Sequence, residues 1–185
     1  TRDALFLSTF GVAFLPRMVI AAAVLSAVLT VVLARVFARV GPARLVPALF
    51  GLSALLLLGE AALVNQARLT IAVVVYLHFT ALGALLVSGF WALVNERFDP
   101  RAARGTIGRI TAGASVGALV GGILPERVGA IWSLTAMLPI LAALHLLAAL
   151  LVLGVESGAK GQPAFPRLEG PDSGFRTLRR LRYLQ

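Results

Sequence analysis

Five long apolar stretches constrain the fold of this chain more than any other feature. They run over about Ala13–Arg35, Leu45–Asn65, Leu69–Val94, Thr106–Leu124 and Val128–Gly154. A helix needs roughly 20 residues to cross a hydrocarbon core of about 30 Å, and each stretch reaches or approaches that length. Charged residues make up 14% of the chain, against about 25% in ordinary soluble domains. The sequence therefore predicts an all-α membrane protein with about five transmembrane helices.

The chain divides into three segments by composition. We predict that residues 1–12 are the end of a truncated first helix and an extracytoplasmic loop, and that residues 13–154 are the transmembrane bundle. Residues 155–185 are predicted to be a cytoplasmic linker, rich in Gly, Pro and charge over Ser157–Gly174. The linker leads into Phe175–Gln185, which suits a basic amphipathic helix on the membrane surface or the approach to a further span. Because the chain starts with Thr1, we expect a fragment of a longer protein.

The distribution of basic residues predicts the orientation of the bundle. Three segments are rich in arginine or lysine: the connections after the first and third stretches, and the tail after the fifth. The other two connections hold only Arg68 and Arg127. Because cytoplasmic loops carry the Lys/Arg excess, the basic segments are predicted to be cytoplasmic and the N-terminus extracytoplasmic. With five spans, all three basic segments fall on the same side.

Several classes of chemistry find no pattern in this sequence. Cysteine is absent, which excludes disulfides, thiolate metal sites and thiol catalysis. The two histidines lie 67 residues apart and form no metal-binding motif. The sequence also lacks a phosphate-binding P-loop and a nucleophile elbow. We therefore expect no enzyme, no metal and no cofactor, and we expect the lipid bilayer rather than nucleic acid to be the partner of this chain, whose net charge is +9.

The third stretch carries small and polar side chains at helical spacing. His78, Ala81, Leu85, Ser88, Ala92 and Asn95 follow one another at intervals of three or four residues, with Trp91 on the adjacent side. Such a stripe either packs against another helix or lines a wet cavity. His78 lies about 14 Å into the stretch, where an ionisable residue usually faces a cavity or a partner. We predict that these residues bind substrate or line a cavity, in which His78 could take up or release a proton. The alternative for His78 is a neutral imidazole bonded to another helix.

Glycines recur four residues apart in the fourth stretch, at Gly113, Gly117 and Gly121. Glycines at this spacing form a flat strip on one helix face, which another backbone can approach closely. We predict that this strip is a helix-packing surface. In its functional version, the strip is the surface where two moving halves of a protein touch.

Three further polar residues within the apolar stretches are candidates for a contact or a site. Glu60 lies near the outer end of the second stretch and is predicted to reach the interface or to pair with Arg68. Arg17 either extends toward the interface or binds an anion, and it joins the candidate substrate-binding residues. His145 has apolar neighbours on both sides, which favours a hydrogen bond to another helix.

The segment Gly89–Gly122 resembles a known family. It contains the aromatic pair Phe90-Trp91, then Asn95, the short charged loop Glu96–Arg104 and the Gly/Ala-rich run Gly108–Gly122. This order is similar to that of the ATP/ADP translocase-like branch of the major facilitator superfamily. The opening Arg2-Asp3 is also similar to the end of that branch's first helix. The resemblance implies that the chain covers roughly helices 2–6 of twelve, most of the N-terminal six-helix half, and that its partner is the missing C-terminal half.

One departure from that branch bears on the solute. The nucleotide exchangers carry an acidic residue in the cavity helix upstream of the aromatic pair, whereas this chain has Tyr76-Leu77-His78-Phe79-Thr80 there. We therefore do not expect ATP/ADP exchange. We expect a multi-pass permease of the bacterial inner membrane, a secondary active transporter that moves a small polar or anionic solute by alternating access. The alternative is a non-transporting sensor or scaffold, in which a transporter-like bundle anchors a soluble regulatory domain.

Overall fold

The computed structural model describes residues 2–97 and 103–158, and this part of the chain is helical without any strand. Its elements are α1 (Arg2–Leu7), the short 3-10 helix η1 (Val12–Phe14), α2 (Leu15–Val40), α3 (Pro42–Leu63), α4 (Arg68–Arg97), α5 (Ala103–Ile131), the 3-10 helix η2 (Leu134–Ala136) and α6 (Met137–Gly158). The predicted linker, from residue 159 onward, and the predicted basic helix lie outside the described residues.

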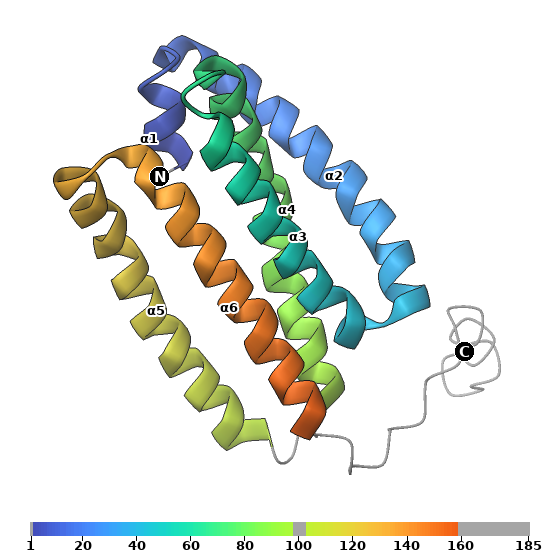
Figure 1. The fold of residues 1–185 in the computed structure, drawn as a ribbon. Helices are drawn as coiled ribbons and strands as arrows, with labels where there is room; N and C mark the ends of the chain where they lie inside the picture. The colour runs from blue at the N-terminus through green and yellow to red at the C-terminus, as the bar shows by residue number, and fades with distance from the viewer. Residues whose placement is uncertain (1, 98–102, 159–185) are drawn as a thin grey trace, which may run out of the picture.

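Within the described ranges, five helices are long and apolar enough to cross a membrane, which confirms the number predicted from the sequence. They cover Val12–Val40, Pro42–Leu63, Arg68–Glu96, Ile107–Ile131 and Leu134–Gly154. Figure 1 shows the helices side by side, with α3, α4 and α6 in the middle and α2 and α5 on the flanks. This is the arrangement of a multi-pass membrane protein.

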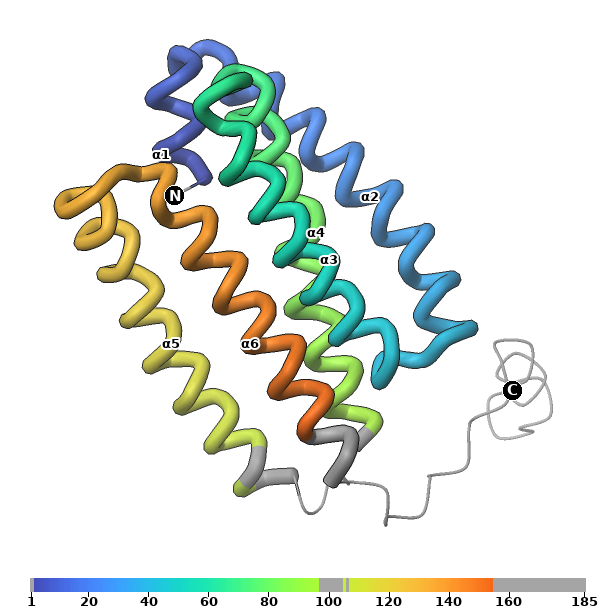
Figure 2. Tube along the Cα trace, viewed as in Figure 1, coloured from blue at the N-terminus to red at the C-terminus, as the bar shows by residue number. Residues whose placement is uncertain are grey.

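The two ends of the bundle differ in the connections that they hold (Figure 2). We call the end with Gly41, Arg97 and the last turn of α6 the basic end, because the predicted cytoplasmic segments meet there. The other end holds η1, the connection 64–67 and η2, and we call it the opposite end. At the basic end, Gly41 has a φ of 82°, which glycine adopts at no steric cost. Pro42 then starts α3, so the turn between α2 and α3 is tight.

The boundary between the fourth and fifth spans differs from the sequence prediction. α5 continues past the predicted end at Leu124, and α6 begins nine residues after the predicted start at Val128. Pro125 lies inside α5 and does not end it. The turn falls at Ser133, whose hydroxyl accepts a hydrogen bond of 3.3 Å from the Ala136 backbone N–H. Pro125, Glu126 and Arg127 interrupt the apolar run inside α5, so hydropathy placed the boundary there and not at the turn.

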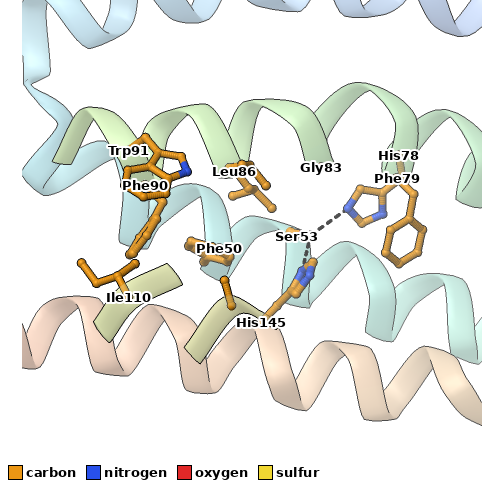
Figure 3. A pocket seen from close by; sticks show the side chains of 12 residues that line it. Phe50, Ser53, His78, Phe79, Gly83, Leu86, Phe90, Trp91, Ile110 and His145 are labelled. Atoms are coloured by element: carbon orange, nitrogen blue, oxygen red, sulfur yellow. Dashed lines mark hydrogen bonds between the residues drawn. The ribbon is translucent and has the colours of Figure 1, made fainter. Parts of the chain in front are cut away.

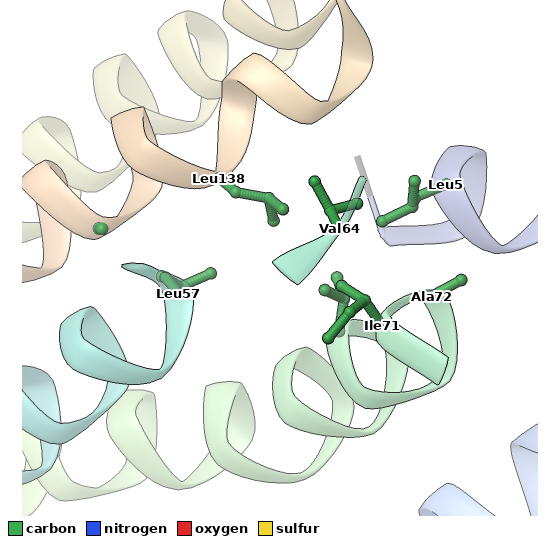
Figure 4. Close-up of a cluster of buried hydrophobic side chains, with 8 residues drawn as sticks. Leu5, Leu57, Val64, Ile71, Ala72 and Leu138 are labelled. Atoms are coloured by element: carbon green, nitrogen blue, oxygen red, sulfur yellow. The ribbon is translucent and has the colours of Figure 1, made fainter. Parts of the chain in front are cut away.

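The tightest apolar packing lies in the half of the bundle near the opposite end. A cluster of buried side chains from α1, α3, α4, α6 and the connection after α3 fills this half (Figure 4). We call it the opposite-end cluster; its members are Leu5, Leu57, Val64, Ile71, Ala72, Val75, Leu138 and Ala142. Four of them, Leu57, Ala72, Val75 and Leu138, have no exposed surface. The centre of the bundle is therefore closed on this side by apolar groups.

Toward the basic end, α4 comes close to α2 and α3 at Gly89. A Cβ atom at this position would lie 3.0 Å from Phe37 Cζ and 3.2 Å from Val46 Cγ2. Carbon atoms in good contact are about 3.5–4.0 Å apart. The absence of a side chain at Gly89 is therefore part of how these three helices fit.

α5 is the helix least covered by the rest of the described chain. None of the central residues of its span is buried. At Gly113, Gly117 and Gly121, an added Cβ atom would meet nothing within 4 Å. The predicted packing strip therefore has no partner among residues 2–97 and 103–158.

Candidate functional site

A chain of hydrogen bonds joins three helices at the centre of the bundle. Ser53 lies eleven residues into α3, about 16 Å along the helix. Its Oγ atom is 2.8 Å from Nε2 of His78 on α4 and 2.6 Å from Nδ1 of His145 on α6. Figure 3 shows both imidazole rings directed at this hydroxyl. One fully buried serine therefore binds both histidines of the sequence.

The chain continues from His78 to an acidic residue. His78 Nδ1 lies 2.9 Å from Glu60 Oε1 on α3, and the two side chains are only 5% and 4% exposed. The second carboxyl oxygen, Oε2, is buried and has no hydrogen-bond partner among the described residues. The predicted pair between Glu60 and Arg68 does not form, since Arg68 is exposed and Glu60 turns inward. The order of the groups is therefore Glu60, His78, Ser53, His145.

The chain of hydrogen bonds forms one end of a cavity of about 450 Å³ between α3, α4, α5 and α6. The cavity lining extends along α4 from His78 to Trp91, which is about 20 Å of helix toward the basic end. Figure 3 shows Phe90, Trp91 and Ile110 at the end far from the histidines. Glu60 is not among the lining residues. A molecule in the cavity thus meets the imidazoles and the serine, with the carboxyl group behind His78.

Aromatic rings hold the two imidazoles in place. His78 stacks on Phe79 with ring centroids 5.4 Å apart, and Phe50 meets the ring of His145 edge-on at 5.8 Å. Most of the other lining residues are apolar. The polar groups of the cavity are therefore concentrated at its inner end, near the middle of the membrane-spanning helices.

The structure brings two of the predicted cavity residues of α4 to this site. His78 and Trp91 both line the cavity. Ala81 and Leu85 are buried but lie away from the cavity lining. The face of α4 that borders the cavity includes Leu86 instead, and it is rotated from the stripe that the small side chains indicated.

The remaining predicted site residues lie on exposed surface. Ser88, Ala92 and Asn95 are exposed on α4, and none of them lines the cavity. Arg17 is exposed in the first turn of α2, near the opposite end, and is not part of the cavity wall. These four residues are therefore not part of the cavity wall that His78 and Trp91 line.

Ser53 is not among the site residues predicted from the sequence, and the contacts predicted for Glu60 and His145 were separate from each other. One signal could have found the group: Glu60 is the only acidic residue within the five predicted stretches. Together with the two histidines, it forms the complete set of residues in those stretches that gain or lose a proton near neutral pH or below. An ionisable residue inside a membrane usually has an ionisable partner.

Another polar contact lies on the side of α4 that faces α1. Arg2 Nη1 donates a hydrogen bond of 2.9 Å to Thr80 Oγ1, and its guanidinium lies 4.9 Å from the ring centroid of Tyr76. Arg2 also pairs with Asp3, at 3.0 Å. This contact attaches the short helix α1 to α4 and compensates the arginine charge.

The order Ser53, His78, Glu60 is that of the serine hydrolase triad, but the surroundings do not suit nucleophilic attack. The hydroxyl of Ser53 is fully buried and already shared between two imidazoles. In the middle of an α-helix, the backbone N–H groups are used by the helix, so they cannot stabilise an oxyanion. No three His, Cys, Asp or Glu residues of the described ranges are placed to hold a metal ion. What this arrangement can do is hold a proton and pass it along.

Known proteins give no further assignment: comparison with protein families, with curated proteins and with solved structures found no match.

Proposed function

We propose that this chain is part of a secondary active transporter in a bacterial inner membrane, which moves a small polar or anionic solute by alternating access. The observation that carries the proposal is the cavity of about 450 Å³ that ends on the bonded groups His78, Ser53 and His145. Polar and ionisable groups inside a membrane are costly and usually mark the path of a solute or an ion. A purely structural bundle has no need of such a chain of hydrogen bonds beside a cavity.

The two halves of the bundle differ as one state of a transporter would require. The cavity extends from the polar centre toward the basic end, whereas the opposite-end cluster fills the other half with apolar side chains. A second pocket, of about 320 Å³, lies at the opposite end beside Asn65, Arg68, Ser133 and Thr135. Val64 belongs both to the lining of this pocket and to the opposite-end cluster. A cavity on one side of the polar centre and closed apolar packing on the other is what alternating access implies for a single conformation.

The resemblance to the major facilitator superfamily supports the same proposal. The aromatic pair Phe90-Trp91, on which the resemblance depends, lines the cavity. The open glycine strip on α5 leaves a flat face for a second half of the protein. In this proposal the chain supplies most of the N-terminal six-helix half, and the solute moves between the two halves.

The test uses the natural absence of cysteine. Val87 lines the cavity and is exposed, so a cysteine there should react with a small water-soluble thiol reagent. We would screen inorganic phosphate, nucleotides, carboxylates, sugars and amino acids for protection of Val87→Cys. The matched control is Ser88→Cys, one residue away and outside the cavity lining, which no solute should protect.

A solute that protects Val87→Cys should also accumulate in proteoliposomes that contain the purified protein under an imposed ion gradient. If nothing in the panel gives protection or uptake, the transporter proposal is wrong and the sensor or scaffold hypothesis takes its place. Protection of both cysteines by the same solute would also count against the cavity as the binding site.

A further inference from the structure

We propose that Glu60 and His78 together bind one exchangeable proton, and that Ser53 and His145 carry this proton between the pair and the cavity. The evidence for proton binding comes only from the contacts of these four residues. The use of the proton to drive solute movement rests on the transporter proposed above.

The charge of the buried pair requires the proton. If Glu60 is ionised and His78 is neutral, the site holds one uncompensated negative charge, with Glu60 Oε2 unbonded among the described residues. An uncompensated buried charge costs several kcal/mol. One added proton removes the net charge, whether it resides on the imidazole or on the carboxyl group. The proton therefore belongs to the pair rather than to either residue.

Both nitrogen atoms of His78 are occupied, so a proton reaches this ring through a bonded neighbour. Nδ1 bonds Glu60 and Nε2 bonds Ser53. His145 uses Nδ1 for Ser53, while its Nε2 has no hydrogen-bond partner among the described residues. Because the ring of His145 lines the cavity, its Nε2 is the atom at which the hydrogen-bond chain can exchange a proton with cavity water.

The transfer leaves every group bonded. With His78 neutral, its Nδ1–H donates to Glu60, the hydroxyl of Ser53 donates to His78 Nε2, and His145 Nδ1–H donates to Ser53. A hydronium ion of the cavity then gives its proton to His145 Nε2. The Nδ1 proton of His145 moves to Ser53 Oγ as the hydroxyl proton of Ser53 moves to His78 Nε2. His145 ends neutral, His78 ends as an imidazolium beside the carboxylate, and the two bonds to Ser53 are reversed. Distances of 2.6 and 2.8 Å suit both directions.

The other helices bring no competing charge to the pair in the described ranges. On α1, Arg2 and Asp3 pair with each other on the side of α4 that carries Thr80. α5 contributes the apolar residues Ile110 and Ala114 to the cavity. α2 packs on α4 through apolar side chains, and its arginines are exposed. The electrostatics of the site are therefore set by Glu60, His78 and His145.

The proton is connected to one end of the bundle in this conformation. Leu57 and Val64, one turn before and one turn after Glu60 on the same segment, belong to the opposite-end cluster. No polar side chain of that cluster continues the chain beyond Glu60. Exchange with the pocket at the opposite end therefore requires these apolar side chains to move apart.

Proton uptake by the purified protein tests the site without any solute. We would titrate from about pH 8 to about pH 5, the range in which histidine gains its charge, and count the protons bound per chain. Glu60→Gln and His78→Gln should each bind about one proton fewer than the unmodified protein. Glu96→Gln, an exposed acid near the end of α4, is the matched control and should bind the same number. Equal uptake by Glu60→Gln and the unmodified protein would overturn the proposal.

The unmodified protein gives a second measurement that does not depend on the folding of a variant. Infrared difference spectra over the same range should show a single protonation. Either the imidazole becomes an imidazolium and the band of the bonded carboxylate shifts, or the carboxylate becomes a carboxylic acid and the band of the bonded imidazole shifts. An imidazole change without any carboxyl change would show that Glu60 takes no part.

The relay is tested by the rate of proton uptake after a rapid pH jump. His145→Gln keeps a donor for Ser53 but cannot pass a proton from one ring atom to another. We expect it to slow uptake by the pair by about 100-fold, the scale of a positioned proton-transfer group. Glu96→Gln should keep the rate of the unmodified protein, and an unchanged rate in His145→Gln would refute the relay.

These results are separable from the transport assay. Proton uptake without any solute protection would leave the proton site standing and remove the transporter. Solute protection with no loss of proton uptake in Glu60→Gln would leave the transporter standing and remove the proton site.

Discussion

Ser53→Ala is the change whose effect on stability follows most directly from the contacts of the site. The substitution removes one hydroxyl and leaves the volume of the side chain nearly unchanged. That hydroxyl is the shared partner of His78 Nε2 and His145 Nδ1. Its loss therefore breaks two hydrogen bonds and leaves two imidazole nitrogens without partners near the centre of the bundle.

The loss of unfolding free energy can be estimated in two ways: from the hydrogen bonds that are broken, and from the polar groups that are left without partners. Hydrogen bonds between helices in a membrane contribute about 0.6 kcal/mol on average and up to about 1.7 kcal/mol. A buried polar group left without a partner costs about 1–3 kcal/mol. Two lost hydrogen bonds give about 1–3 kcal/mol and two unpartnered groups about 2–6 kcal/mol; the ranges overlap at about 2–3 kcal/mol, which is the expected loss for Ser53→Ala. Alanine is a better helix former than serine by a few tenths of a kcal/mol, which offsets only a small part of this loss.

The assay is the unfolding free energy of the purified protein in detergent micelles, measured by titration with a denaturing detergent. Ser115→Ala is the matched control, because Ser115 also lies inside a helix but bonds only the Thr111 carbonyl of its own helix, at 3.1 Å. The control should keep its stability or gain slightly. If both variants differ from the unmodified protein by less than about 0.5 kcal/mol, the shared hydrogen bonds of Ser53 do not stabilise the bundle.

Three further predictions concern the fold. Cysteines at Arg44 and Arg68 should be labelled from opposite sides of the membrane, because Arg44 lies in the first turn of α3 and Arg68 begins α4, after α3 has crossed the bundle; labelling from one side would remove the second span. Gly89→Ala should be less stable than Gly59→Ala by about 1–3 kcal/mol, since an added Cβ at position 89 lies 3.0 Å from a ring carbon while position 59 has nothing within 4 Å; equal melting temperatures would show that the neighbours yield freely. Gly117→Leu should not lower the unfolding temperature of the described bundle, because nothing packs there; a lower temperature would show that a further segment covers the strip.

The number and order of the spans could be predicted because hydropathy reports the cost of placing side chains in lipid. The same property gave poor boundaries where charged residues lie inside a helix. α2 runs to Val40 although Arg35 and Arg39 precede its end, because long basic side chains can extend to the interface from inside a helix. Between α5 and α6, the turn depends on the capping hydroxyl of Ser133, a local contact that mean hydropathy does not sense.

The site was only partly predictable, because it depends on the rotation of α4 against its neighbours. Helical spacing placed His78 in a stripe of small and polar side chains, but small residues indicate close packing and a wet wall equally well. In the structure the small stripe divides: Ala81 is buried and Ser88 is exposed, while large side chains such as Leu86 border the cavity. When a helix is apolar on most of its circumference, its sequence does not show which neighbouring helix each side contacts. Contacts between distant positions, such as that of Ser53 with His145, leave no periodic signal.

The position of the acidic group changes what a cavity molecule would encounter. The expected location for an acid was the cavity helix itself, upstream of the aromatic pair, and α4 has none there. α3 supplies it instead: Glu60 reaches His78 from a neighbouring helix, at 2.9 Å. Because Glu60 lies behind the imidazole and outside the cavity lining, its negative charge is compensated by His78 before it faces the cavity. Once the proton has passed to His78, the polar group that a solute meets is the Nε2–H of His145, a donor suited to carboxylate or phosphate oxygens. The same geometry that stores a proton behind the cavity therefore leaves the cavity itself free of negative charge.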